Sequence, residues 1–178
     1  MEVILLRHPT DKDWMECKRR ALVTMGKEVK TPPSMEWKRK MLKARHSPIR
    51  YLQFSFYLKD IPSWVSVHLV RHIHAQPYVK SQRNDRQDNY DRTKAPQDSP
   101  VDMIWDMNAE EFMTICNKRL CNKASYETRQ VVKMMCQAVA KTNFEFRPFM
   151  DPNCLYLNGS PEMDPCGANY SGNMIIFG

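Results

Sequence analysis

The chain has 178 residues, of which 42% are hydrophobic and 26% charged, and its formal net charge is +7. This length and balance are typical of one soluble globular domain with a sizeable core. No apolar run is long enough to cross a bilayer, and the apolar start of the chain is too short for a signal peptide. We therefore expect a cytoplasmic protein without a membrane partner.

The positive charge predicts an anionic partner, which could be nucleic acid, a nucleotide or a phosphorylated cofactor. The arginines are scattered along the chain and are not arranged in basic stripes with aromatic residues. This pattern favours a small phosphorylated ligand and makes nucleic acid the weaker alternative. The six cysteines contain no CxxC pair, so we expect structural or incidental thiols and no metal site.

The first half of the chain alternates between short apolar runs and helical patterns. We expect a strand over residues 2–6, helices over 11–26 and 33–45, and a strand over 51–60. In the last of these, apolar residues occupy every second position, which is typical of a half-buried strand: Leu52, Phe54, Phe56 and Leu58. We expect this strand to be central to a sheet.

A helix is predicted over residues 63–73, where Trp64, Val67, His68 and Arg71 share one face. Arg71 should therefore be held by a rigid element. The polar, proline-punctuated residues 84–100 are predicted to be a long loop. Two helices should follow over residues 107–142 and pack on the sheet.

The fold class we predict is α+β, with a mixed sheet packed against long helices. Residues 1–150 should form the catalytic domain. Residues 151–178 carry Pro, Gly and Asn throughout and should form an irregular C-terminal tail.

Several motifs in the same order resemble those of the flavin-dependent thymidylate synthases, the ThyX family. Residues 71–85, "RHIHAQPYVKSQRND", occupy the frame of the family signature RHRxxSxxxxSxRY. Residues 46–72 resemble the segment that precedes this signature, and residues 107–129 resemble a later block of the form NxRSLxHFLxLRxxxxAQxEIR. Arg92 and Pro96 match an R-x-x-LP motif. The resemblance runs from about Glu2 to about Phe149.

The resemblance implies a homotetramer in which FAD and dUMP bind in clefts between subunits. It implies synthesis of dTMP from dUMP, with FAD as cofactor and with methylenetetrahydrofolate and NADPH as co-substrates. No cysteine nucleophile is needed, which agrees with the interpretation of the cysteines.

The family positions for dUMP are occupied by residues that can bind it: His68, Arg71, Ser81, Arg83, Arg92 and Arg119. Arginines form bidentate, charge-assisted bonds to phosphate and to pyrimidine carbonyls, and a serine hydroxyl can bond the same groups. Arg119 matches an arginine that favours the ionised pyrimidine, so Arg119 and Ser81 are the catalytic candidates. His68 replaces a glutamine and can still hydrogen-bond.

The positions implied for FAD are Ser47, Arg71, His72 and Asn108. Other positions on the flavin side depart from the family pattern: Ile73, Val79, Glu110 and Thr114 have replaced polar or oppositely charged residues, and Arg50 stands where a glutamate is usual. The chain thus resembles a compact, divergent member in which dUMP should bind with ordinary affinity and FAD more weakly than is usual for the family. A second hypothesis is a catalytically weakened protein that binds pyrimidine nucleotides.

Structural interpretations of these residues remain open on spacing alone. Arg119 lies on an apolar helix face and needs either a ligand anion or a carboxylate such as Glu127. His74 has no counterpart in the family and should be a surface or packing residue. Trp64 and Trp105 should belong to the core.

Overall fold

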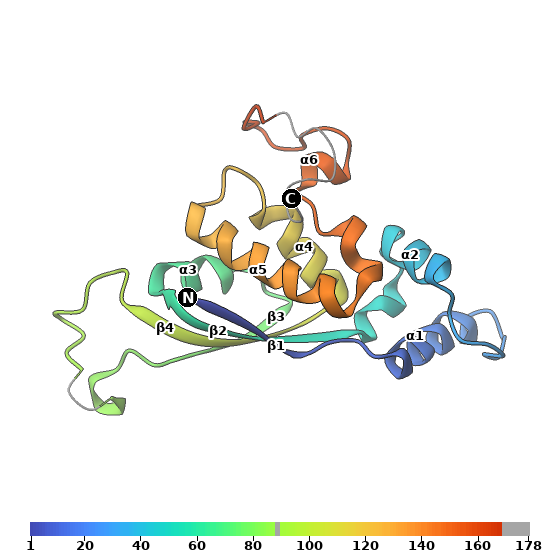
Figure 1. Ribbon diagram of the computed structural model, residues 1–178, viewed down its shortest axis with the longest axis horizontal. Coiled ribbons are helices and arrows are strands. Elements are labelled where there is room, and N and C mark those ends of the chain that lie inside the picture. Colours follow the sequence, from blue (N-terminus) through green and yellow to red (C-terminus); the bar gives the residue numbers. More distant parts are fainter. Residues whose placement is uncertain (88–89, 169–178) are drawn as a thin grey trace.

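The computed structural model describes residues 1–87 and 90–168 and forms one sheet with helices on one of its faces (Figure 1). The sheet has four strands in the order β1-β2-β4-β3. Their bounds are Glu2–Arg7 for β1, Gln53–Pro62 for β2, Ala75–Val79 for β3 and Pro100–Asn108 for β4. The α+β class and the central position of the strand after residue 51 are confirmed. Every pairing between the described strands is antiparallel, however, and not mixed as expected.

The helices begin at residues suited to cap them. Their bounds are Asp11–Val23 for α1, Met35–Lys43 for α2, Ser63–Leu69 for α3, Ala109–Arg119 for α4, Tyr126–Thr142 for α5 and Asn153–Tyr156 for α6. Thr10 and Asp13 form a reciprocal capping box at the start of α1. Asn108 caps α4 by accepting a hydrogen bond from the backbone N–H of Glu111 at 2.9 Å. This cap fixes the start of the helix that carries Arg119.

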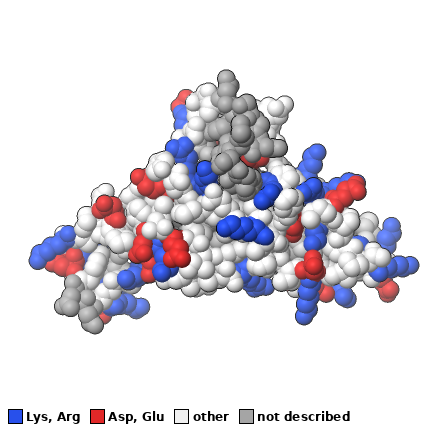
Figure 2. Space-filling model, in the orientation of Figure 1, with Lys and Arg blue, Asp and Glu red and all other residues white. Residues whose placement is uncertain are grey.

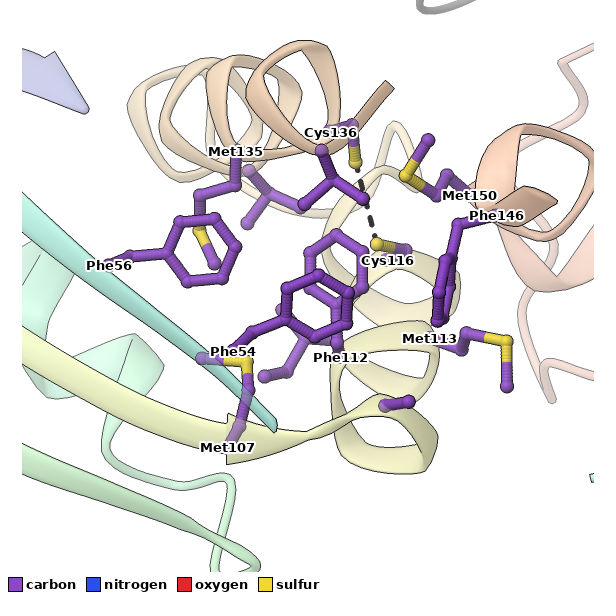
Figure 3. Packing of buried hydrophobic residues seen from close by; sticks show 14 of the residues in the cluster. Phe54, Phe56, Met107, Phe112, Met113, Cys116, Met135, Cys136, Phe146 and Met150 are labelled. Atoms are coloured by element: carbon purple, nitrogen blue, oxygen red, sulfur yellow. Dashed lines mark hydrogen bonds between the residues drawn. The ribbon is translucent and has the colours of Figure 1, made fainter. Parts of the chain in front are cut away.

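Aromatic side chains from β2, α4 and the 3₁₀ turn Phe144–Phe149 form the centre of the core (Figure 3). Phe112 of α4 lies 4.9 Å from Phe54 and 5.7 Å from Phe56, measured between ring centroids. Phe146 lies 5.2 Å from Phe54. The alternation predicted for β2 is confirmed, since both of its phenylalanines are buried. This cluster anchors α4 on the sheet.

Two strands were not predicted. In β4 the buried residues Val101, Met103, Trp105 and Met107 alternate with more exposed ones. The predicted loop ended at residue 100 and the predicted helices began at residue 107, so no element was assigned to residues 101–106. Strand β3 contains Pro77 and lies at the edge of the sheet, where a missing backbone N–H is tolerated.

The segment after α3 also differs from the prediction. The helix ends at Leu69, so Arg71 lies in the following turn and is exposed. It is therefore not part of the rigid helix over residues 63–73 that the spacing predicted. Val70 is exposed as well, whereas Leu69 is buried. Trp105 is buried as expected, and Trp64 is half-buried.

The described part of the tail, residues 151–168, contains the short helix α6 and turns. The remaining tail positions, 169–178, lie outside the described residues. No described helix has both the length and the apolar character that a membrane span requires. Within residues 1–87 and 90–168, no three His, Cys, Asp or Glu side chains are grouped as metal ligands.

All six cysteines are free thiols, as expected, and three of them are buried. Cys116 and Cys136 contact each other across α4 and α5, with their sulfur atoms 3.4 Å apart (Figure 3). Burial raises the pKa of the Cys17 thiol to about 12, with the nearby Arg20 charge opposing the rise. Between about pH 9 and 12 the folded chain therefore keeps the Cys17 proton that an exposed thiol would release.

We expect the free energy of unfolding to fall as the pH rises above about 9, because the unfolded chain then loses the Cys17 proton and the folded chain retains it. The Cys17 share of this slope is ~1.4 kcal/mol per pH unit up to the folded pKa. Denaturant titrations over this range should show a shallower slope for Cys17→Ala than for the wild type. The same change at half-buried Cys166 is the control, and equal slopes for Cys17→Ala and wild type would contradict the prediction.

Candidate anion-binding site

Arg119, in the last turn of α4, is half-buried and held by neutral groups. Its Nε–H donates to Nε2 of His72 at 2.9 Å, and one terminal nitrogen donates to the backbone carbonyl of His68 at 2.8 Å. The salt bridge to Glu127 that spacing allowed is not formed. Among the described residues Arg119 has no carboxylate partner. The site therefore holds a guanidinium whose charge is available to a ligand.

His72 is buried and connects Arg119 to a carboxylate. Its Nδ1 lies 3.2 Å from Oε1 of Glu111, which is also buried. A guanidinium has no acceptor, so the Nε2 atom that receives the Arg119 bond must lack a proton. The proton then lies on Nδ1 and is donated to Glu111. The hydrogen bonds thus fit a neutral imidazole in one defined tautomer.

A second positive charge lies close to Arg119. The pKa of Arg119 is lowered from its usual value, first by burial and then by the charge of Arg71. Within the described residues, Arg71 is exposed and its side chain forms no hydrogen bond or ion pair. Two neighbouring guanidinium groups without carboxylates are electrostatically suited to an anion.

A cavity of 480 Å³ opens beside Arg119, and tail residues form part of its wall. Its lining residues are His72, Lys118, Arg119, Cys121, Lys123, Ala124, Glu162, Met163 and Asp164. Lys118 pairs with Glu162 at 3.0 Å, and Lys123 forms an ion pair with Asp164. The tail carboxylates are therefore paired with lysines, and the Arg119 charge is left facing the cavity.

A second cavity, of 370 Å³, lies on the other side of Glu111. Its lining residues are Arg50, His74, Asn108, Glu110, Glu111 and Thr114. Glu111 thus lines this cavity while its partner His72 lines the first. Asn108 and His72, both expected on the flavin side, fall in neighbouring cavities, whereas Ser47 is exposed and lines neither.

The charge reversal at Glu110 is compensated in the structure. Nε of Arg50 lies 2.5 Å from Oε2 of Glu110, so the two departures from the family pattern form an ion pair. The two residues lie 60 positions apart, so no local pattern in the sequence predicts their pairing. His74, expected at the surface or in packing, is exposed and lines the same cavity.

Three of the residues expected to bind dUMP lie on the loop between β3 and β4, which projects beyond the sheet (Figure 1). Arg83 pairs with Asp85 through two bonds of 2.9 and 2.6 Å. The Ser81 hydroxyl accepts from the backbone N–H of Arg83 at 3.3 Å, and Arg92 is exposed. None of the three lines the described part of the Arg119 cavity. Of the predicted site residues, the described part of one chain brings His68, Arg71 and His72 together around Arg119.

A family model and several solved structures of thymidylate synthases and a UMP/dUMP methylase are similar to this chain. The family model for thymidylate synthase complementing protein matches residues 87–143. The fold is similar to that of ThyX from Helicobacter pylori, solved with FAD and dUMP, at a TM-score of 0.67 and 15% identity over 84% of this chain and 99% of that one. It is also similar to the UMP/dUMP methylase PolB from Streptomyces cacaoi, solved with 5-Br dUMP, at a TM-score of 0.61 and 16% identity over 83% and 95%. No curated protein sequence is a significant match.

The fold and the site define a protein of the α+β class with a cavity suited to an anion. At such low identity the solved structures show the fold, and the family model adds a sequence match over the end of the projecting loop, β4, α4 and α5. Together they confirm the resemblance predicted from the sequence. The chain thus has a ThyX-like fold and resembles the thymidylate synthase complementing protein family over residues 87–143.

Proposed function

We propose that the protein is a flavin-dependent thymidylate synthase that converts dUMP to dTMP. The observation that carries the proposal is the half-buried Arg119, which has neutral hydrogen-bond partners, lies near Arg71 and faces a cavity. A pyrimidine nucleotide offers both a phosphate and a ring that can be ionised, and each can accept bonds from a guanidinium. The structural relatives solved with dUMP or 5-Br dUMP support the same ligand class.

Each residue would have a distinct task. Arg119 would stabilise negative charge on the pyrimidine ring, because a fixed guanidinium in a partly dehydrated site interacts strongly with a developing anion. Arg71 would bind the phosphate or the flavin beside it. In the second cavity, Asn108 and His74 would donate hydrogen bonds to the polar part of FAD, and Arg50, which is paired with Glu110, would have less charge to offer its pyrophosphate. FAD supplies the hydride when bound, with methylenetetrahydrofolate and NADPH as co-substrates.

The test is the formation of dTMP from dUMP, followed by mass spectrometry, in a mixture with FAD, methylenetetrahydrofolate and NADPH. We expect product in the complete mixture and none when methylenetetrahydrofolate is omitted. The second candidate, a catalytically weakened pyrimidine-nucleotide-binding protein, is favoured by the changes on the flavin side. It would bind dUMP in calorimetry and form no dTMP at any FAD concentration.

We expect dUMP to bind with ordinary affinity and FAD to bind more weakly than is usual for flavin-dependent thymidylate synthases. Ile73 is 83% exposed and offers no charge where an arginine is expected. Loss of one charge-assisted bond costs ~1.5–3 kcal/mol, or about ten- to a hundred-fold in affinity. Calorimetry with each ligand, and the flavin absorbance of the purified protein, check this. Tight FAD binding with no detectable dUMP binding would reverse the ranking and remove the basis for the proposed site.

We further propose a cytoplasmic homotetramer in which the loop carrying Ser81, Arg83 and Arg92 completes the site of another copy. The loop projects away from the sheet, as an element that reaches a neighbour would. Light scattering should give the mass of four chains. Mixing two inactive variants, Arg119→Met and Arg83→Met, should restore part of the activity, because some mixed sites would then contain both wild-type arginines. A stable monomer that binds dUMP would contradict the shared site.

A further inference from the structure

The two cavities are joined by a continuous hydrogen-bonded chain of buried or half-buried side chains. Glu111 bonds His72 at 3.2 Å, and His72 bonds Arg119 at 2.9 Å. Glu111 and His72 are only 6% and 9% exposed. A buried carboxylate is costly unless its charge is compensated, and the nearest hydrogen-bonded route from Glu111 to a cation passes through His72 to Arg119. Glu111, His72 and Arg119 thus form one connected hydrogen-bonded unit.

The direction of these bonds gives Glu111 a specific effect on Arg119. If Glu111 accepts the Nδ1 proton of His72, Nε2 is left bare and can accept from Nε of Arg119. If the proton were on Nε2 instead, two N–H groups would face each other and the bond to Arg119 would be lost. The carboxylate therefore selects the one tautomer that holds the guanidinium. Together with the bond to the His68 carbonyl, this fixes the plane of the guanidinium.

We propose that Glu111 is a positioning residue for Arg119, acting through the tautomer of His72. This inference rests on the proposed function for its ligand, dUMP, but the positioning itself belongs to the ligand-free protein. Nε and one terminal N–H are committed to His72 and His68, so the remaining N–H groups of Arg119 are left for a ligand in the cavity that Arg119 lines. Glu111 also lines the second cavity, so the group that orients Arg119 is itself in contact with the space proposed for FAD.

A positioning role and a simple charge effect predict opposite changes in dUMP affinity when Glu111 is replaced. Glu111 is a negative group near a site for an anion, so through charge alone its removal should tighten dUMP binding. If Glu111 positions Arg119, its removal should weaken dUMP binding although a repulsive charge has gone. Glu111→Gln separates the two effects further, since the amide oxygen can still accept from Nδ1 while the charge is lost.

The experiment compares the full-length wild type with Glu111→Leu, Glu111→Gln and a control, Glu127→Leu. Glu127 is a half-buried carboxylate on α5 that is not bonded to Arg119 within the described chain. Calorimetry measures dUMP affinity. In the ligand-free proteins, ¹⁵N NMR of the imidazole nitrogens reports the tautomer of His72, and solvent exchange of the Arg119 Nε–H reports its hydrogen bond. His72→Gln and Arg119→Lys assign the two signals.

We expect the Nδ1-protonated tautomer and a protected Arg119 Nε–H in the wild type and in Glu111→Gln, and loss of both in Glu111→Leu. We expect dUMP affinity to fall about ten-fold in Glu111→Leu and to change little in Glu111→Gln and Glu127→Leu. Equal or tighter dUMP binding by a folded Glu111→Leu would overturn the proposal, as would an Nε2-protonated His72 in the wild type. If Glu111→Leu does not fold, the His72 and Arg119 signals of the wild type and Glu111→Gln decide.

Failure of the proposed function gives a different pattern. The wild type would then not bind dUMP, yet the NMR signals would still show whether Glu111 orients His72 and Arg119. If the Nδ1-protonated His72 and the protected Arg119 Nε–H are seen without dUMP binding, the positioning role of Glu111 is supported and the proposed ligand is contradicted. A wild type that binds dUMP without this signature contradicts the positioning and leaves the ligand in place.

Discussion

Replacement of Arg119 by methionine is expected to weaken dUMP binding by about ten- to a hundred-fold, equivalent to ~1.5–3 kcal/mol for lost charge-assisted hydrogen bonds. Methionine has a similar length and tolerates partial burial, so the fold should be retained. Calorimetry of the purified variant against dUMP measures the loss. Arg119→Lys should recover only part of the affinity, because an ammonium group keeps the charge but cannot reproduce the planar geometry held by His72 and His68.

Arg45 offers a matched control for this substitution. It is also half-buried and bonded to neutral groups on α4, the Thr114 hydroxyl at 3.1 Å and the Asn117 side chain. It lines neither the Arg119 cavity nor the second cavity. Arg45→Met should therefore leave dUMP affinity close to that of the wild type. Equal losses in both variants would mean that Arg119 acts only through net charge or stability.

Replacement of Phe112 by alanine should lower the free energy of unfolding by ~3–5 kcal/mol. Its ring is fully buried between two phenylalanines of β2 and Phe146, so the substitution leaves a cavity that the antiparallel strands cannot readily close. Denaturant titration at one fixed protein concentration gives the value, since oligomerisation would otherwise shift the apparent stability.

Phe144 is the control for the core prediction, because it lies in the same 3₁₀ turn as Phe146 and is 50% exposed. Phe144→Ala should cost much less, about 1 kcal/mol or below, through lost contacts with Arg39 and Arg147. Similar losses for the two phenylalanines would show that α4 is not anchored through Phe112.

The sequence predicted the elements in which burial follows a regular period. Strand β2 and the faces of α4 and α5 were of this kind, because each is apolar on one side and packs against the same core. Strand β4 was overlooked although Val101, Met103, Trp105 and Met107 alternate, because residues 101–106 lie between the predicted loop and the predicted helices and were assigned to neither. The end of α3 was placed too late, because Arg71 continues a helical spacing that the backbone does not follow.

The candidate site was only partly accessible from the sequence. Family resemblance identified Arg71, His72 and Arg119, and spacing left open whether a carboxylate or a ligand balances Arg119. No local pattern predicts that His72 joins Arg119 to Glu111, because these residues come from different elements and meet only through tertiary packing. The pairing of Arg50 with Glu110 could not be predicted either, because these two residues also meet only through tertiary packing.

A crystal structure of the protein with dUMP tests the central claim most directly. The account predicts that the nucleotide lies in the cavity beside Arg119, within hydrogen-bond distance of its guanidinium. It also predicts that His72 still links Arg119 to Glu111, and that Ser81, Arg83 and Arg92 approach the nucleotide from another copy of the chain. Binding of dUMP away from Arg119, with this arginine still bonded only to its own chain, would contradict the account.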